Sequence, residues 1–144
     1  MLNPALPEVQ AYELSILKEL TAMYPKLDGV ILDRVRCDAI TADFSDASRQ
    51  LFEAYTGKKI ANWPADIFSY THAKEPKRVE GPLYKQWLEW RAKVIHDFFV
   101  KARGEIKSIN PDISFGDYTG AWYNTYYEVG VNWASKTYNP ADDY

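Results

Sequence analysis

Two short apolar segments, each followed by a carboxylate, constrain the fold of this chain more than any other feature. The first is Val30-Ile31-Leu32, which continues to Val35, and the second is Ile113 to Gly116. Continuous apolar runs of this length are typical of strands that are covered on both faces, as in parallel sheets. Asp33 ends the first apolar run and Asp117 directly follows the second. In a parallel pair, both carboxylates would lie at the same edge of the sheet.

The remaining periodic segments predict helices. Pro7 suits a first helical position and Pro25 stops the run, which predicts a helix over 7–24. Its apolar residues recur every three or four positions, so we expect one stripe to face a core: Val9, Tyr12, Ile16, Leu20 and Met23. Pro82 and Asn110-Pro111 bound the longest helix, which is predicted over 82–109.

Between the first strand and the long helix lie two further predicted segments. Residues 45–55 form a short helix that Ser45 or Asp46 caps and Gly57 ends. Residues 58–81 are predicted to form a polar loop with scattered aromatic residues and charged residues 74–78. A loop of this length is functional or disordered more often than a simple connector.

The order helix, strand, helix, helix, strand predicts an α/β unit with a parallel pair joined by a right-handed crossover. Two parallel strands cannot hide their own edges, and a complete (β/α)₈ TIM barrel needs about 250 residues. We therefore expect residues 1–144 to be a fragment, a single partial barrel domain whose partner is the remainder of the barrel in a longer chain. The alternative is that more strands lie in the C-terminal segment.

Composition excludes several classes of protein. A net charge of −3 over 144 residues lacks the basic footprint of a nucleic-acid-binding protein. No apolar run approaches the roughly 18 residues of a membrane helix, so no membrane span is expected. Residues 1–4 have neither a basic nor an apolar signal-peptide region. The single cysteine, Cys37, excludes an internal disulfide.

The strand ends suggest chemistry. Glycoside hydrolysis uses two carboxylates, about 5 to 5.5 Å apart in retaining enzymes, and Asp33 and Asp117 are the candidate pair. Arg34 and Arg36 would help to keep Asp33 ionised, because a nearby cation lowers the pKa of a carboxyl. Glu128 competes with Asp117 as the proton donor. The alternative reading is a structural ion pair at a strand end.

The C-terminal segment is unusually rich in aromatic rings and amides. Such rings stack under sugars, and the amides of Asn124 and Asn132 could bind hydroxyl groups. Core packing or a protein interface would use the same side chains, so both readings stay open. The aromatic residues of this cluster are Tyr118, Trp122, Tyr123, Tyr126, Tyr127, Trp133 and Tyr138.

Other candidates are weaker. Asp38, Asp43 and Asp46 miss the calcium-loop spacing and favour a solvated loop, so no metal site is predicted. No metalloprotease, phosphate-loop, dinucleotide or nucleophile-elbow motif occurs, so we expect no cofactor. Cys37 is interpreted as a small packing residue and His96 as a surface residue.

The segment Asp28-Gly29-Val30-Ile31-Leu32-Asp33-Arg34-Val35-Arg36 resembles a strand of the glycosyl-hydrolase-like family that is distantly related to the α-amylases. Residues 3–9, 52–57 and 87–91 and the strand 113–116 are similar to the same family, so the resemblance covers most of the chain.

The resemblance implies a (β/α)₈ barrel acting on carbohydrate, with this chain covering about strands four and five. Asp33 then falls where the α-amylase-like nucleophile lies. Asp117 stands where that pattern carries Glu as the proton donor.

From the residues and the resemblance together, we expect a hydrolase of O-glycosidic bonds in an oligo- or polysaccharide, with a retaining mechanism. The isolated chain would be inactive without the rest of the barrel. Substrate-binding residues would be Arg34, Arg36, Tyr118, Trp122, Tyr123, Asn124 and Trp133. The alternative is a non-catalytic carbohydrate-binding protein on a degenerate barrel. The family resemblance implies a secreted or periplasmic protein, whereas the sequence itself leaves the compartment open.

Overall fold

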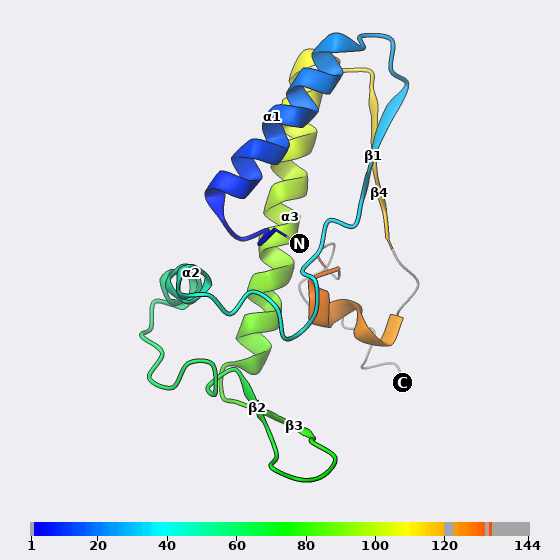
Figure 1. Cartoon of the computed structure of the whole chain (residues 1–144). Coiled ribbons are helices and arrows are strands. Elements are labelled where there is room, and N and C mark those ends of the chain that lie inside the picture. The colour runs from blue at the N-terminus through cyan, green and yellow to red at the C-terminus, as the bar shows by residue number, and fades with distance from the viewer. Residues whose placement is uncertain (1, 120–122, 132, 134–144) are drawn as a thin grey trace.

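The computed structural model of the chain describes residues 2–119, 123–131 and 133. Helix α1 (Pro7–Met23) leads into strand β1 (Gly29–Asp33), and α2 (Asp46–Thr56) precedes the hairpin strands β2 (Phe68–Tyr70) and β3 (Arg78–Glu80). The long helix α3 (Tyr84–Ile109), strand β4 (Ser114–Tyr118) and the 3₁₀ helix η1 (Tyr123–Val129) follow. Figure 1 shows α3 running through the length of the molecule, with β1 and β4 beside one half of it and α2 and the hairpin beside the other.

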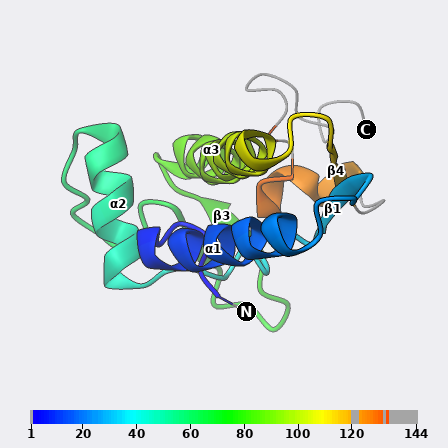
Figure 2. The same ribbon diagram turned by 90° about the horizontal axis from the view of Figure 1, so that it is seen from above.

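The parallel pair predicted from the sequence is confirmed. Strands β1 and β4 pair in parallel, with Val30 opposite Phe115 and Asp33 opposite Tyr118. Helices α1 and α3 cover one face of this pair, as the view from above shows (Figure 2). Val30 and Leu32 point into this helix-covered side, whereas Ile31 points to the other face and is 71% exposed. Within the described residues, the sheet is therefore covered on one face only.

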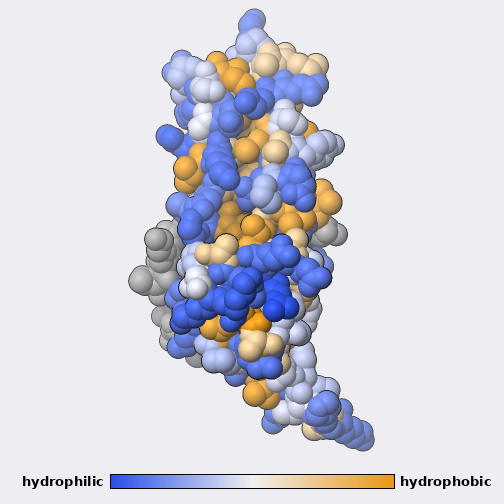
Figure 3. Space-filling model, turned by 90° about the vertical axis from the view of Figure 1, so that its left-hand side faces the viewer, coloured by the Kyte–Doolittle hydropathy of each residue, from blue (hydrophilic) through white to orange (hydrophobic). Residues whose placement is uncertain are grey.

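The prediction for the buried side of α1 is wrong. Leu17 and Thr21 are its buried residues, whereas Tyr12, Ile16, Leu20 and Met23 are exposed. A period of three to four residues identifies an apolar stripe on a helix, but it does not determine which side of the helix packs against another element. Here the buried side faces α3 and β1 through Leu14 and Leu17, and the predicted stripe lies on a flank that nothing in the described structure covers. Hydrophobic side chains are visible among the polar ones on this side of the molecule (Figure 3).

Helix α2 follows its predicted caps closely. The Ser45 hydroxyl oxygen accepts a hydrogen bond from the backbone N–H of Ser48 at 3.2 Å, which satisfies a free donor of the first turn. Gly57 ends the helix with φ of 69°, a left-handed conformation that glycine adopts without a steric penalty.

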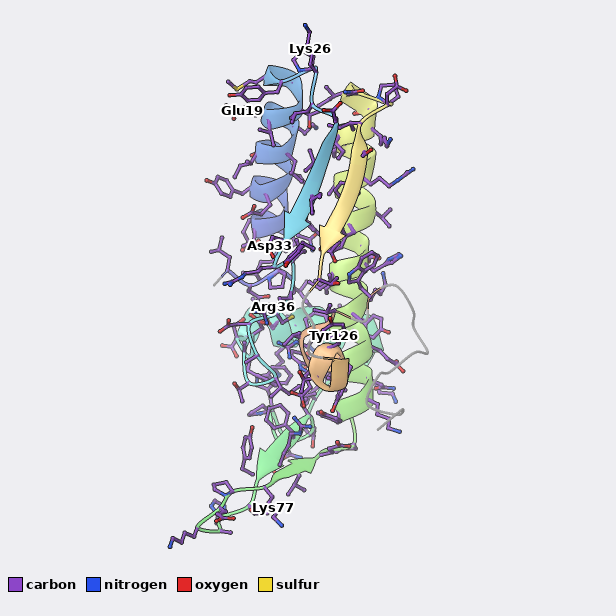
Figure 4. The ribbon with its side chains drawn as sticks, turned by 90° about the vertical axis from the view of Figure 1, so that its right-hand side faces the viewer. Glu19, Lys26, Asp33, Arg36, Lys77 and Tyr126 are labelled. Atoms are coloured by element: carbon purple, nitrogen blue, oxygen red, sulfur yellow. The ribbon has the colours of Figure 1, made fainter. Side chains whose placement is uncertain are left out.

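Residues 58–81 are more ordered than the predicted loop. Strands β2 and β3 pair in antiparallel fashion, with Phe68 opposite Glu80. The hairpin extends away from the body of the molecule, and Lys77 lies near its tip (Figure 4). Three-residue strands are too short to show the alternation that identifies strands from sequence.

Two cores lie along α3. One is mainly aliphatic and lies between α1, α3 and the β1–β4 sheet: Leu17, Val30, Phe98, Ala102, Ile106 and Ile113. The other is rich in aromatic rings and joins α2, the hairpin and the first turns of α3: Phe52, Ile60, Ile67, Phe68, Tyr84, Trp87 and Trp90. No helix in the described part of the chain is both long and apolar enough to cross a membrane.

Candidate functional site

The candidate site lies where β1 and β4 end. Asp33 and Tyr118 are the last residues of the two strands and are register partners, so both side chains project from the same, uncovered face. Asp33 is exposed, and Tyr118 is 69% exposed. Figure 4 looks onto this face and shows Asp33 at the lower end of β1, with Arg36 and Tyr126 beyond it. A carboxylate and an open phenol ring thus lie side by side at the strand ends.

Asp117 lies one position before the end of β4 and pairs with Leu32. It therefore belongs to the helix-covered face, opposite to that of Asp33. It is half-buried, and its carboxylate accepts a hydrogen bond from the indole of Trp133. Burial raises the pKa of Asp117, the Trp133 hydrogen bond opposes that rise, and the negative charge of Asp33 adds to it. The two carboxylates are therefore close enough to interact electrostatically.

Arg34 and Arg36 flank the end of β1. Together with Asp33 they line a cavity of about 300 Å³ between the first half of α1 and the segment that follows β1. Leu17, Leu32 and Phe98 give this cavity an apolar side.

The backbone turns sharply at Arg34, directly after Asp33. Arg34 has φ of 57°, in the left-handed region that residues other than glycine rarely occupy. Such a conformation costs about 1–3 kcal/mol and is concentrated at functional sites. The strained turn at the end of β1 is therefore consistent with a site here.

Glu128 lies on η1 and is tied to the hairpin. Its Oε1 accepts a hydrogen bond from Nη1 of Arg78, on β3, at 2.6 Å, and both side chains are largely buried. Arg78, which the sequence placed in a polar loop, thus lies on β3 and connects the hairpin to η1. Of the two proton-donor candidates, Glu128 has a strong structural partner, whereas Asp117 lies beside Asp33 at the strand ends.

The aromatic residues of the C-terminal segment had two possible roles, stacking on a sugar or packing in a core or interface, and the structure shows a different environment for two of them. Trp133 stacks on Phe99 of α3 with ring centroids 4.5 Å apart and an interplanar angle of 19°, which is packing against the helix. Tyr118 is open to solvent. Trp122, Asn132 and Tyr138 lie outside the described residues, as do the side chains of Tyr123 and Asn124.

Sequence reasoning missed Arg91. It lies on α3, is 1% exposed and interacts through its guanidinium with the segments that follow both β1 and β4. The sequence did contain a signal for a buried Arg91. This residue lies four positions after Trp87 and four before Ile95, on the same side of the predicted long helix as these two apolar residues. A charged residue in an apolar stripe indicates a buried side chain with several partners.

Asp38, Asp43 and Asp46 do not form a metal site, and no other group in the described part of the chain does so. Asp43 instead forms an ion pair with Arg91, between Oδ2 and Nη2 at 3.2 Å. Cys37 is buried, as expected of a packing residue, and His96 is exposed.

The chain matches the family Glycosyl hydrolase-like 10 over residues 1–138. It belongs to this family. It is also 36% identical over 143 residues to an S-layer-related protein of Niallia circulans, covering 94% of this chain and 9% of that protein. The chain thus spans about a tenth of the length of this relative. No solved structure matches it.

Proposed function

We propose that this chain is part of the (β/α)₈ catalytic barrel of a glycoside hydrolase that cleaves O-glycosidic bonds in an oligo- or polysaccharide. Membership in a glycosyl hydrolase-like family supports the reaction class. The observation that carries the proposal is that β1 and β4 bring two carboxyl groups within electrostatic reach at their ends, Asp33 on the uncovered face and Asp117, whose pKa is raised, on the helix-covered face. The proposal therefore requires the Asp117 carboxyl to reach the substrate past the end of β4.

The covered and uncovered faces of the sheet support the barrel. Parallel strands are almost always buried on both faces, yet Ile31 is 71% exposed and β1 pairs with β4 alone among the described strands. A closed barrel would cover the face of Ile31 with the other strands. A further strand on the open edge of β1, with its own helix, would cover the exposed flank of α1.

In a retaining mechanism, the two carboxyl groups act in turn. An oxygen of Asp33 bonds to the anomeric carbon as the glycosidic bond breaks, and Asp117 donates its proton to the departing oxygen. Water then attacks the same carbon, gives a proton to Asp117 and releases Asp33. Arg34 and Arg36 line the same cavity as Asp33 and are the candidates for binding substrate hydroxyl groups there.

The test is hydrolysis of a panel of polysaccharides by the whole protein that contains this chain. Asp33→Asn and Asp117→Asn should each lower kcat by at least about 10²-fold, because a general acid or base alone contributes about 10²–10⁴-fold. Asp112→Asn, at an exposed carboxylate in the turn before β4, is the matched control and should leave the rate unchanged. Hydrolysis by Asp33→Asn within a few-fold of the parent would refute the role of nucleophile.

The second candidate is carbohydrate binding without catalysis. Two observations favour it: Asp117 projects to the helix-covered face, and Tyr118 offers an open ring beside Asp33. This reading predicts saturable glycan binding, no released product, and loss of binding in Tyr118→Ala. Trp133→Ala is a poorer test, because that ring also packs on Phe99.

A further inference from the structure

Arg91 makes four polar contacts with the segments that follow the two strands. Its Nη2 donates to the carbonyl oxygen of Ala39 at 2.7 Å and to Oδ2 of Asp43 at 3.2 Å. Its Nη1 donates to the carbonyl oxygens of Glu128 at 2.8 Å and Ile40 at 3.4 Å. The guanidinium therefore binds two segments that are far apart in the sequence.

These two segments are the continuations of the two strands. Residues 34–43 follow Asp33, and η1 follows Asp117 and Tyr118. A direct backbone bond adds to the contact, because the N–H of Cys37 donates to the carbonyl oxygen of Val129 at 3.0 Å. A Cβ on Gly130 would lie 3.0 Å from the carbonyl oxygen of Arg91, so η1 ends in close contact with α3.

The geometry of this contact suits arginine specifically. A guanidinium offers five donors in a planar fork, whereas the lysine ammonium is a single point of charge on a flexible stem. Burial of a cation is costly unless its donors are satisfied. Here one carboxylate and three carbonyl oxygens satisfy the two terminal nitrogens, while Nε is buried without a hydrogen-bond partner among the described residues. Asp43, the carboxylate partner, is itself held at φ of 70°. The contact is thus buried and made by several hydrogen bonds, unlike a surface ion pair. We call it the Arg91 joint, and it comprises Arg91, residues 37–43 and residues 128–130.

We propose that Arg91 is a positioning residue, which joins the segment after β1 to the segment after β4 and so fixes the two halves of the candidate site relative to each other. Its effect on catalysis rests on the proposed function. Its effect on the two segments does not, and it can be measured separately.

The accessibility of the Cys37 thiol can be used to measure how often the Arg91 joint opens. It lies within the segment after β1, is 3% exposed and is the single cysteine of the chain. Burial raises the pKa of its thiol to about 11, so at neutral pH the thiol is both protonated and covered. Reaction with a thiol reagent therefore requires local opening of the joint.

The experiment measures the labelling rate of Cys37 in the whole protein, by mass spectrometry of the peptide that contains it. Arg91→Lys keeps the charge but loses the fork, and we expect labelling to become about tenfold faster. Arg103→Lys is the matched control, because Arg103 is an exposed arginine on the same helix, and its rate should match the parent. An unchanged rate in a cooperatively melting Arg91→Lys would overturn the proposal.

A second variant tests the proposal if Arg91→Lys does not fold. Asp43→Asn keeps the shape of the carboxylate partner and removes its charge, and we expect Cys37 to label about threefold faster. A parental rate in this variant would overturn the proposal in the same way.

The catalytic consequence is read from the kinetics of the same variants. If the proposed hydrolase activity holds, Arg91→Lys should lower kcat more than it raises KM, because the strand-end groups lose their alignment while the substrate contacts remain. Equal changes in Arg91→Lys and Arg103→Lys would contradict a positioning role. Absence of hydrolysis in the parent would refute the proposed function alone, since the labelling result stands without it.

Discussion

Helix α3 passes through two regions that bury their side chains in different ways. The strand region consists of α1, β1, β4 and the second half of α3, and the loop region consists of α2, the β2–β3 hairpin, η1 and the first half of α3. The loop region surrounds an aromatic core in which Trp87 is fully buried. The strand region leaves Ile31 and a flank of α1 exposed. The loop region thus buries its aromatic side chains against the first half of α3, whereas the described strands are covered on one face only.

The largest effect is expected in the aromatic core. The indole of Trp87 packs against Phe44, Phe52 and Trp90 with ring centroids 4.8–5.1 Å apart. Trp87→Ala should therefore reduce the free energy of unfolding by about 3–5 kcal/mol. Urea denaturation measures the loss, and hydrogen exchange should place it in α2 and the hairpin before β1 and β4. Equal loss of protection in both regions would contradict their separation.

An intermediate effect is expected from Glu53, an anchor of the loop region. Its carboxylate accepts hydrogen bonds from the N–H of Ile60 at 3.0 Å and from Lys59 at 2.6 Å. These bonds, that from Ile60 first, lower its pKa from 4.5 to about 2. Since the folded-state pKa is the lower one, the stabilisation is complete above about pH 4.5 and is lost as pH falls towards about 2.

Thermal melts of the parent and Glu53→Gln across this range test the prediction. The parent should melt at a higher temperature at pH 7, and the difference should shrink as pH falls through that window. A difference that is constant with pH would mean that the carboxylate charge plays no part.

The smallest effect is expected at Ile31, on the open face of the strand region. In the 144-residue chain, Ile31→Ala should change the free energy of unfolding by no more than about 0.5 kcal/mol, as for most surface substitutions. In the whole protein the barrel proposal predicts a loss of about 2–5 kcal/mol, because other strands would then cover the side chain. Val100→Ala, at an exposed position on α3, is the control in both. Equal small losses in the two proteins would argue against a barrel.

Helices and strands whose ends are marked by local residue preferences were predicted from the sequence. Features that depend on contacts between distant segments were not. Ser45 and Gly57 mark the ends of α2 through their own backbone preferences, so that helix was predicted well. The buried side of α1 was not, because periodicity identifies a stripe and not its neighbour. The hairpin was missed because each of its strands is three residues long.

The candidate site was predicted in a similar, partial way. The placement of Asp33 and Asp117 at one edge followed from two apolar runs, and the parallel register bears it out. Their opposite faces follow from the register, which pairs Asp117 with Leu32 and not with Asp33, and two apolar runs do not specify that register. The role of Arg91 depends on carbonyl oxygens from distant segments, which no local pattern encodes.

The placement of α2 and the hairpin between β1 and α3 has a consequence for how proteins of this kind diversify. A parallel pair needs only a crossover of about a dozen residues to connect its strands. Here the connection also carries α2 and the hairpin, which have their own core and meet the strand ends through Arg78, Arg91 and Glu128. Such an insertion can lengthen, shorten or change its outer surface without disturbing the register of β1 and β4. Relatives with the same two strands and a different insertion would present a different surface beside the strand ends.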